Sequence, residues 1–437
     1  MSTASRHHKA CVIGAGPCGL TAIRNLAEHG VEDVICHEAL DAIGGLWAYS
    51  DDPERPSVYD SAHIISSRRL SAFRDFPMPA DYPDYPSHSQ IADYFRAYAD
   101  RFGLHDRIRL RSSAETAEHR AGGGWTLTIR DENGTHEETA DNLIVASGHH
   151  RIPFTPKLDG DFAGAQMHSA EYRSSRGFAG KRVLVVGAGN SACDIAAALS
   201  RVADHVSLSL RTPQYIVPKT ILGRPVDVQY RKLQKLPRIL RNAILRYGVR
   251  AYVGPYERYN LPQPHSDVLS THPTLNSDIL EQLTHGRVAV RRATQSASGH
   301  TVRFADGESA EFDTIIWATG YVTKFPFLNA PEFDWSESLR LPLYLKMMPV
   351  EMRDIFFIGL IQPLGCIWAL ADYQSELAAH AITGRWKRPA DIARRLEAEH
   401  ARDAARFRQT ARHAVEVDYH DYLALMRQEL NPVRKAA

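Results

Sequence analysis

The stretch Lys9-Ala-Cys-Val-Ile-Gly14-Ala-Gly-Pro-Cys-Gly19 decides the fold that we expect for this chain. An apolar strand leads into a Gly-x-Gly-x-x-Gly turn, a helical pattern follows to Gly30, and a second strand pattern covers 33–38. In this context the first glycine makes the tight turn, the second lets a pyrophosphate approach the backbone, and the third lets helix and strand pack closely. The turn therefore predicts a dinucleotide site with loop contacts from Gly14, Gly16, Pro17 and Gly19.

Glu38 ends the second strand of this unit. A carboxylate at that position accepts hydrogen bonds from the ribose hydroxyls of an adenosine, and it repels a 2′-phosphate. The first site is therefore expected to prefer an unphosphorylated ribose, as in FAD or NAD.

The same order of elements recurs in the second half of the chain. Strand patterns cover 182–187 and 205–210 with a helical pattern between them, and the turn reads Gly187-Ala-Gly-Asn-Ser-Ala192. The closing strands also match, since Val145-Ala-Ser-Gly148 ends the first copy and Trp317-Ala-Thr-Gly320 ends the second. An internal duplication of nucleotide-binding units is the simplest interpretation. The second cofactor is then expected to contact Gly187, Gly189, Asn190 and Ser191.

Arg211 lies 24 positions beyond Gly187, the same count that separates Glu38 from Gly14. On this count Arg211 takes the place of Glu38, where an arginine can bind a 2′-phosphate through charge-assisted hydrogen bonds. Arg211, with Thr212 beside it, therefore predicts NADPH at the second site, and a solvated strand-end charge is the alternative. Two dinucleotide sites imply that a hydride passes from nicotinamide to flavin, which then does the chemistry.

The composition restricts the classes of partner. The chain has 437 residues and a formal net charge of +1, so no overall field attracts nucleic acid. No signal peptide is visible, and no window carries the roughly 18 apolar residues of a spanning helix. The five cysteines show no CxxC pair or ligand spacing, which predicts neither a disulfide framework nor a metal site. A cytoplasmic location, a small-molecule substrate and no membrane association are expected.

The segment from Arg231 to Arg250 combines basic side chains with leucines and isoleucines in a helical pattern. A basic amphipathic helix of this kind can lie on an anionic membrane surface. The alternative, and the one we adopt as the expectation, is a helix that packs on its own domain and exposes its basic face.

Five motifs resemble, in their order along the chain, those of the flavin-containing monooxygenases, a class B flavoprotein family related to the Baeyer–Villiger monooxygenases. They are Gly44-Gly-Leu-Trp47, Asp75-Phe-Pro-Met-Pro79, the FxGxxxHxxxY segment 162–172, Trp317-Ala-Thr-Gly-Tyr321 and Gly359-Leu-Ile-Gln-Pro363. The resemblance implies an α/β fold with two Rossmann-like dinucleotide-binding domains. The NADPH-binding domain (161–325) would be inserted into the FAD-binding domain (1–160 and 326–437, the latter including C-terminal helices).

The resemblance also adds residues to the expected sites. The family's second flavin contact and its flavin-side strand correspond to Gly45, Leu46, Trp47 and Gln362. Its ATGY motif adds three residues to the cofactor site, namely Thr319, Gly320 and Tyr321. Its domain-junction fingerprint corresponds to Phe162, Gly164, His168 and Tyr172. Gly164 would permit a turn there, and His168 would hold the junction by hydrogen bonding rather than by acid–base chemistry.

Ile65 departs from the family pattern. The family has an asparagine here, associated with the flavin C4a position, whereas an isoleucine side chain neither donates nor accepts a hydrogen bond. Ser66 or Ser67 substitutes for it, or bound NADP⁺ and the backbone do, or the chemistry differs from ordinary N- or S-oxygenation. All three residues are expected at the flavin face or in the substrate pocket.

The activity implied by the resemblance is an FAD- and NADPH-dependent monooxygenation. A flavin C4a-hydroperoxide would transfer one oxygen atom of O₂ to an amine nitrogen or a sulfur. No side-chain acid, base or nucleophile is required, so no catalytic residue is assigned. Alternatives are ketone oxygenation of the Baeyer–Villiger type, an NADPH oxidase, a flavin disulfide reductase (disfavoured by the lack of CxxC) and a redox sensor without turnover. Family habit suggests a homodimer.

Overall fold

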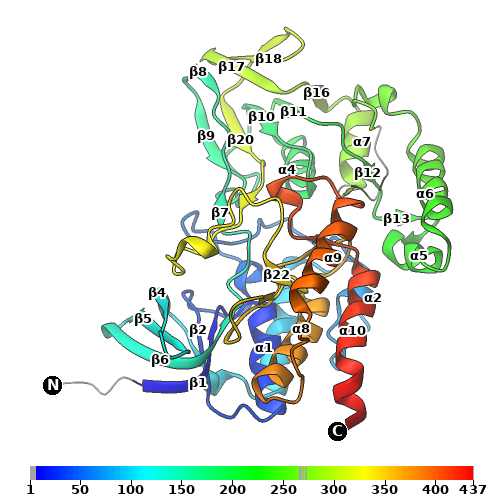
Figure 1. Ribbon diagram of the computed structural model, residues 1–437. Helices are drawn as coiled ribbons and strands as arrows, with labels where there is room; N and C mark the ends of the chain where they lie inside the picture. The colour runs from blue at the N-terminus through cyan, green and yellow to red at the C-terminus, as the bar shows by residue number, and fades with distance from the viewer. Residues whose placement is uncertain (1–5, 265–267, 269, 271–272, 437) are drawn as a thin grey trace. The chain divides into compact units, whose positions relative to one another are not determined.

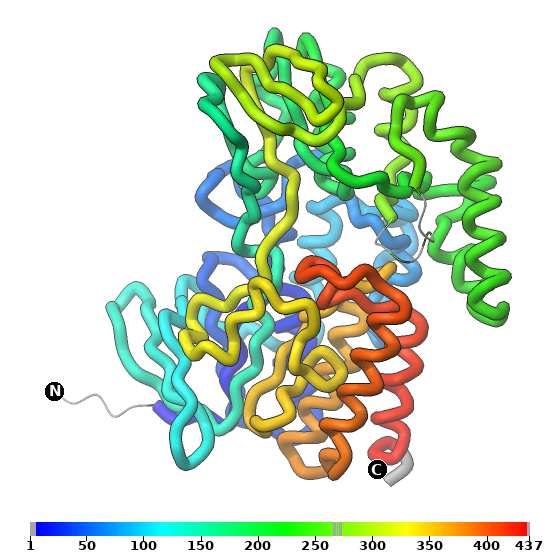
Figure 2. The backbone as a smooth tube through the Cα atoms, turned by 45° about the horizontal axis from the view of Figure 1, so that its top comes forward, coloured from blue at the N-terminus to red at the C-terminus, as the bar shows by residue number. Residues whose placement is uncertain are grey.

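The computed structural model describes residues 6–264, 268, 270 and 273–436 (Figures 1 and 2). The chain forms two compact units. Unit 1 comprises Met1–Ala48, Arg68–Ile152 and Val322–Ala437, and unit 2 comprises Tyr49–Ser67 and Pro153–Tyr321. Among the described residues, no helix is long and apolar enough to cross a membrane.

Unit 1 is built on a seven-stranded sheet in the order β3-β2-β1-β6-β5-β4, with β24 beside β6. Its parallel strands are β1 (Arg6–Ile13), β2 (Val34–His37), β3 (Ile108–Arg109), β6 (Gly134–Val145) and β24 (Ile355–Phe357). The strands β4 (Ser113–His119) and β5 (Trp125–Asp131) extend the sheet antiparallel. Because parallel strands end at one edge, Gly14, Glu38 and Ala146 meet there, where nucleotides bind in such sheets.

Two long helices meet inside unit 1. The helix α1 (Pro17–Glu28) starts at the first glycine turn and packs on α8 (Ile367–Ile382), as Figure 1 shows. Buried polar groups join them, since Asn25 Nδ2 donates to Asp372 Oδ1 at 2.9 Å. The other helices of the unit are α2 (Arg68–Ser71), α3 (His88–Arg101), α9 (Ile392–Ala404) and α10 (Tyr419–Ala436). The charged C-terminal segment is thus helical and belongs to unit 1.

Unit 2 contains a five-stranded parallel sheet in the order β16-β11-β10-β20-β9. These strands are β9 (Ala165–His168), β10 (Arg182–Val186), β11 (His205–Ser209), β16 (Val288–Arg291) and β20 (Thr314–Trp317). The helices α4 (Asn190–Leu199) and α7 (Asp278–Thr284) pack together in this unit. A smaller sheet contains β8 (Asp159–Phe162), β17 (Thr294–Gly299), β18 (Thr301–Phe304) and β19 (Ser309–Glu311). Asp306-Gly307 lies in the turn that joins β18 to β19.

The strand β6 runs without a break from the Asn133-Gly134 turn to Val145, because one edge of it pairs with β5 and the other with β1. Two local features differ from the sequence predictions. Residues 49–67, expected with the first domain, belong to unit 2. The basic segment forms two helices, α5 (Val226–Leu233) and α6 (Arg238–Val253), because Pro237 cannot continue a helix and precedes the first residue of α6.

Candidate functional site: two glycine turns

The first glycine turn has no room for side chains. Gly14 has φ +101°, and a Cβ on it would lie 2.8 Å from the carbonyl oxygen of Ala146. A Cβ on Gly19 would lie 1.8 Å from the carbonyl oxygen of Gly14. The structure therefore confirms the roles assigned to the first and third glycines, a tight turn and close helix packing. Gly16 is the N-cap of α1 and offers no side-chain cap, so the helix N-terminus keeps unpaired N–H groups for an anion.

The predicted second flavin contact lies against this turn in unit 1. The N–H of Gly44 donates to the carbonyl of Ala15 at 2.9 Å, and a Cβ on Gly45 would lie 3.2 Å from Gly16 Cα. Gly45, Leu46 and Trp47 form a single 3₁₀ turn, and the Trp47 ring meets Trp368 edge to face. Two glycine backbones thus form a narrow cradle at the helix N-terminus, which fits the pyrophosphate of a dinucleotide.

Glu38 is buried at the end of β2 and is held by the backbone. Its Oε2 accepts from Ala15 N–H at 2.7 Å, and its Oε1 accepts from Leu40 N–H at 2.9 Å. A carboxylate oxygen can accept more than one hydrogen bond. The two amide bonds therefore fix the carboxylate beside the turn, where it can bind a ribose.

His149 is a residue that the sequence analysis missed. It follows the closing turn of the first copy and contacts Gln362 on β25 (Gln362–Pro363), together with the backbone of Gly359. Burial lowers the pKa of His149 to about 4, and the hydrogen bond with Gln362 opposes that shift. Its Nε2 is buried without a partner in the described part of unit 1. A neutral imidazole with an open nitrogen thus stands beside the predicted flavin-side glutamine.

The second turn repeats the backbone of the first. Gly187 has φ +140°, and a Cβ on it would lie 2.3 Å from the carbonyl oxygen of Ala318. Gly187 N–H donates to Ser209 at 2.9 Å, as Gly14 N–H donates to His37 at 2.8 Å. Gly189 caps α4 without a side-chain bond, as Gly16 caps α1. The fit to a second dinucleotide is therefore the same as in unit 1.

The alignment of Arg211 with Glu38 was wrong by one residue. Ile13 pairs with His37, and the matching Val186 pairs with Ser209, so the structural counterpart of Glu38 is Leu210. The second copy has one residue fewer between its glycine turn and the end of its second strand, which equal counting could not detect. Leu210 is buried, whereas Arg211 lies one position farther and is exposed.

Segment 49–67 is held in unit 2 by partly buried polar groups. Tyr59 OH donates to Asp194 Oδ2 at 2.7 Å, and Asn276 Nδ2 donates to Asp194 Oδ1 at 2.6 Å. Ser67 N–H donates to Asp227 Oδ2 at 2.6 Å. Burial raises the pKa of Asp194, and its hydrogen bond from Tyr59 opposes this shift. Because Asp194 lies on α4, the segment is tied to the helix that starts at the second glycine turn.

The three residues expected at the flavin face lie at the end of this segment. Ile65 is half-buried, and Ser66 and Ser67 are buried. The Ser67 hydroxyl has no hydrogen-bond partner among the described residues, so it keeps both a donor and an acceptor. A polar group therefore stands two positions from Ile65.

The fingerprint residues act within unit 2. His168 Nδ1 accepts from Ala170 N–H at 3.1 Å, so its Nε2 carries the hydrogen that it donates to the carbonyl of Gly320 at 3.1 Å. Burial lowers the pKa of His168, which favours this neutral form. Gly164 is required by space, since a Cβ there would lie 2.5 Å from Asp313 O and 2.7 Å from the Phe162 ring.

The end of the fingerprint holds the segment 49–67. Tyr172 is buried and its ring meets Tyr59 edge to face. The guanidinium of Arg173 donates to the carbonyls of Asp52, Pro53 and Arg55. Arg173 and Asp194 were not predicted as site residues. The signal for Asp194 was present in the sequence, because it is the one charged residue of the helix Asn190–Leu199.

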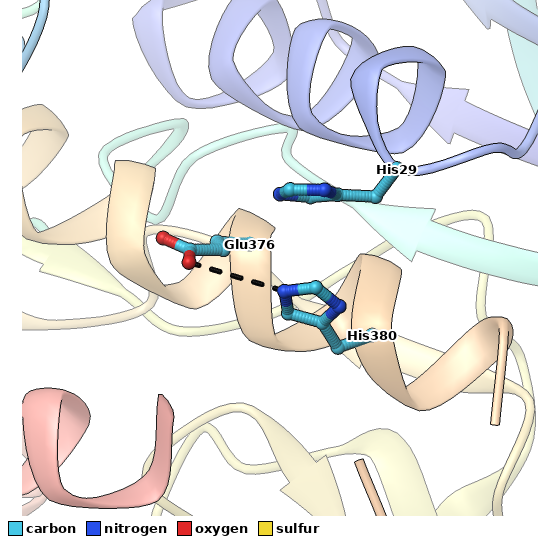
Figure 3. A group of neighbouring side chains, drawn as sticks. All are labelled: His29, Glu376 and His380. Atoms are coloured by element: carbon cyan, nitrogen blue, oxygen red, sulfur yellow. Dashed lines mark ion pairs between the residues drawn. The ribbon is translucent and has the colours of Figure 1, made fainter. Parts of the chain in front are cut away.

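A further group of ligand-type side chains lies away from both turns, in unit 1. His29, Glu376 and His380 offer ligand atoms within 4.8 Å of one another (Figure 3). The two imidazole rings are tilted by 31° with centroids 4.3 Å apart, and Glu376 accepts from Arg434 Nε at 2.7 Å and also pairs with Arg74. Glu376 is the only carboxylate among these three residues, and the positive charges of Arg74 and Arg434 beside it disfavour the binding of a divalent cation. The group joins α1, α8 and α10.

Fold and turns together define a mixed α/β protein with two glycine turns of the kind that dinucleotide-binding proteins use. The chain matches the model of the "Flavin-binding monooxygenase-like" family over residues 7–433, and it belongs to that family. It is therefore a flavoprotein monooxygenase whose cofactors are FAD and NADPH.

Named relatives and solved structures agree with this assignment. The chain is 33% identical to flavin-containing monooxygenase 5 of Rattus norvegicus over 94% of this chain and 80% of that protein. It is 31% identical to dimethylaniline monooxygenase [N-oxide-forming] 2 of Oryctolagus cuniculus over 95% of this chain and 81% of that protein. S-allyl-L-cysteine S-oxygenase from Allium sativum shares the fold with a TM-score of 0.72 at 23% identity, covering 99% of this chain and 90% of that one. A cyclohexanone monooxygenase shares the fold with a TM-score of 0.72 at 19% identity, covering 98% of this chain and 98% of that one.

Proposed function

We propose that the protein inserts one oxygen atom of O₂ into a soft nucleophile, an amine nitrogen or a sulfur, at FAD that NADPH has reduced. FAD would bind at the turn of unit 1 and NADPH at the turn of unit 2. Each cofactor would then have its own Rossmann-like domain, with the NADPH-binding domain inserted into the FAD-binding domain. The observation that carries the proposal is the duplicated glycine turn, with a buried carboxylate after one copy and an exposed arginine after the other.

In unit 1 the residues bind and orient. The backbones of Gly16 and Gly45 leave space for a pyrophosphate, and Pro17 starts α1 with the φ that a helix needs. Glu38 would bind the ribose hydroxyls in the orientation set by Ala15 and Leu40. Gln362 and His149 would face the isoalloxazine as uncharged hydrogen-bonding groups.

In unit 2 the N-terminus of α4 would bind the second pyrophosphate. The Asn190 side chain is engaged, since its Oδ1 accepts from Leu275 N–H at 2.9 Å, so its role at the turn is to shape the loop. The backbone N–H groups of Gly189 and Ser191 would bind the phosphates, since the Ser191 hydroxyl is bonded to Tyr59. Arg211 and Thr212 follow β11, and the exposed guanidinium can bind a 2′-phosphate bidentately.

The segment with Ile65 would respond to the nicotinamide cofactor. Asp194 and Tyr59 join the segment to α4, so occupancy of the turn at Gly187 would stabilise the position of Ile65, Ser66 and Ser67. Ile65 would exclude water from its surroundings, and the Ser67 hydroxyl, which has no partner among the described residues, would supply a hydrogen bond in place of the family asparagine. When bound, reduced FAD supplies the activation of O₂. A soft nucleophile then needs only access, and no acid or base of the chain takes part.

The test is oxygen transfer with labelled gas. The holoenzyme is incubated with ¹⁸O₂, NADPH and one substrate of each class, a tertiary amine, a thioether or a ketone, and the products are analysed by mass spectrometry. One ¹⁸O atom in an N-oxide or sulfoxide supports the proposal. Label confined to an ester from the ketone would assign Baeyer–Villiger oxygenation instead. Hydrogen peroxide with no labelled product from any class would contradict oxygenation and indicate an NADPH oxidase.

A further inference from the structure

A buried carboxyl group in the C-terminal part of unit 1 has no role in the functions assigned so far. Glu416 lies on β26 (Glu416–Val417), and only 4% of the residue is exposed. No lysine or arginine of the described residues forms an ion pair with it, and its partner is His413, whose Nε2 lies 3.7 Å from Glu416 Oε1. Burial raises the pKa of Glu416 to about 8, and the charge of Arg412 opposes this shift. Glu416 therefore carries a proton at neutral pH.

This carboxyl group stands beside the predicted flavin-side strand. The strand β26 pairs with β25 in parallel, and the register places Glu416 opposite Gln362. Gln362 N–H donates to the carbonyl of Val415 at 2.7 Å, in agreement with this register. Paired residues of neighbouring strands point to the same face and lie about 4.8 Å apart, so the two side chains are neighbours. Gln362 in turn contacts His149, whose buried Nε2 has no partner in the described part of unit 1.

On its other side the carboxyl group is connected to solvent through an imidazole. His413 ends the 3₁₀ turn η5 (Ala411–His413), and its side chain is 13% exposed. Its Nε2 is the atom nearest to Glu416, and its Nδ1 is hydrogen-bonded to the hydroxyl of Thr410, which is exposed. A neutral imidazole accepts a proton at one nitrogen and releases one from the other. We call Glu416 and His413 the C-terminal pair.

The charged groups around the C-terminal pair keep it at one proton. Burial lowers the pKa of His413 to about 4, and the positive charges of Arg412 and Arg408 lower it further. Lys346 reaches the backbone of the same segment, but its Nζ pairs with Asp403 at 2.6 Å. At neutral pH the imidazole is therefore uncharged, and the proton of the pair resides on the carboxyl group.

The proposed oxygen transfer consumes one proton in each turnover. NADPH, one proton, O₂ and the substrate give NADP⁺, the oxygenated substrate and one water molecule. The hydride of NADPH brings two electrons and one hydrogen, so the second hydrogen of that water comes from solvent. We propose that the C-terminal pair carries this proton from solvent to the side of β25 where Gln362 and His149 stand. The inference rests on the proposed function, since only that reaction requires the proton there.

The transfer has two steps that balance. In the first, the O–H bond of the Glu416 carboxyl group breaks, and the proton moves past Gln362 and His149 to the oxygen atom that leaves as water. In the second, His413 takes a proton from solvent on the Thr410 side and releases the proton of its other nitrogen to the carboxylate. The pair returns to its starting state. Attack by the soft nucleophile is a separate event and needs no acid or base.

The first readout is the infrared absorption of the carboxyl group, which requires no turnover. The oxidised, flavin-loaded protein is titrated from about pH 6 to about pH 10, on either side of the expected midpoint. We expect a protonated carboxyl signal that is lost near pH 8 in the wild type and is missing from Glu416→Gln. Loss of the Glu416 signal already below about pH 6 would overturn the proposal, because the group would then hold no proton at neutral pH.

The second readout separates the two halves of the reaction by stopped flow. Anaerobic reduction of the flavin by NADPH moves only a hydride, so Glu416→Gln should keep the wild-type rate. Product formation from the reduced enzyme, O₂ and a thioether should slow by about tenfold or more, and its decline above about pH 8 should disappear. Glu416→Asp keeps an ionisable proton and should restore part of the rate. His413→Gln should slow the same half of the reaction.

Glu399→Gln is the matched control. Glu399 is another buried carboxyl group of unit 1, and burial raises its pKa to about 7, but it lies on α9 and accepts from Leu345 N–H at 3.0 Å. This variant should match the wild type in both halves of the reaction. If the wild type forms product and Glu416→Gln has the same rate and pH profile, the relay is overturned and the proposed function stands. A wild type that forms no oxygenated product refutes the proposed function, and the relay with it.

Discussion

The two glycine turns share one backbone and differ in the side chains that come directly after the second strand. In both units the first glycine donates to the end of the second strand and lies against an alanine carbonyl, Ala146 or Ala318. In unit 1 the next residue is the buried Glu38, while in unit 2 it is the buried Leu210 and the charge appears one residue later, exposed, at Arg211. The comparison shows that the backbone of the glycine turn is duplicated. The preference for a ribose with or without a 2′-phosphate depends instead on side chains, whose positions need not align between the two copies.

The largest effects should come from filling the turns. Gly19→Ala places a Cβ 1.8 Å from Gly14 O, so we expect purified protein with little flavin and unfolding at a lower temperature, a cost of about 3 kcal/mol or more. Gly187→Ala should keep the flavin and lose NADPH binding. Flavin absorbance and thermal melts measure both. Gly103→Ala is the control, because its φ is +61° but no atom lies within 4 Å. Equal flavin loss in the Gly19 and Gly187 variants would contradict separate sites.

The buried imidazole after the first closing strand should make unit 1 sensitive to acid. His149 stands where unit 2 has Tyr321, and burial lowers its pKa from 6.5 to about 4. The stabilising contribution of the neutral His149 side chain is full above pH 6.5 and is lost as the pH falls toward 4. Between these two pH values His149 gains a proton in the unfolded chain but not in the folded one. The expected loss is about 3 kcal/mol at about pH 4. Urea unfolding of His149→Gln from about pH 7 to about pH 4 should show a flatter profile, and the exposed control His63→Gln should not. A profile for His149→Gln as steep as the wild type would refute this assignment.

In unit 2, Asp194 links segment 49–67 to the helix α4 that starts at the second glycine turn. Asp194→Ala leaves Tyr59 OH and the Asn276 amide without an acceptor, which should cost about 2 kcal/mol. Freed from α4, segment 49–67 should also hold the flavin environment less well, so more hydrogen peroxide should appear per NADPH oxidised. Tyr59→Phe removes one of the two bonds and should show a smaller change in the same direction. Unchanged peroxide release in Asp194→Ala would show that the segment acts independently of α4.

The smallest effect is expected at the exposed arginine. Arg211→Gln removes a charge-assisted contact to the 2′-phosphate, so the KM for NADPH should rise about tenfold while the KM for NADH stays constant. Arg303→Gln in the same unit is the matched control. If the KM values for NADPH and NADH rise by the same factor, Arg211 does not recognise the 2′-phosphate.

Sequence patterns predicted the parts of the site that depend on local geometry. The glycine turns and the two closing strands depend on residues that allow few backbone alternatives. Counting placed Arg211 one residue out of register, because the length of a helix-to-strand connection is set by packing and not by the motif. The membership of segment 49–67 in unit 2 was not predictable, since it depends on Asp194 and Arg173, which lie more than a hundred residues away.

The placement of α6 was missed for a related reason. An amphipathic pattern shows that a helix has an apolar face, but only tertiary structure shows which face is covered. The structure buries the face of α6 with Val249 and Val253 and leaves Ile239 and Tyr247 exposed.

The most direct test of the central claim is anaerobic reduction of the bound flavin in Gly187→Ala. We predict that the variant retains its flavin, that dithionite reduces it fully, and that NADPH reduces it at least a hundredfold more slowly than in the wild type, or about 2.7 kcal/mol. Reduction by NADPH at the wild-type rate would show that the second glycine turn does not bind the nicotinamide cofactor, and the division of labour between the two units would be wrong.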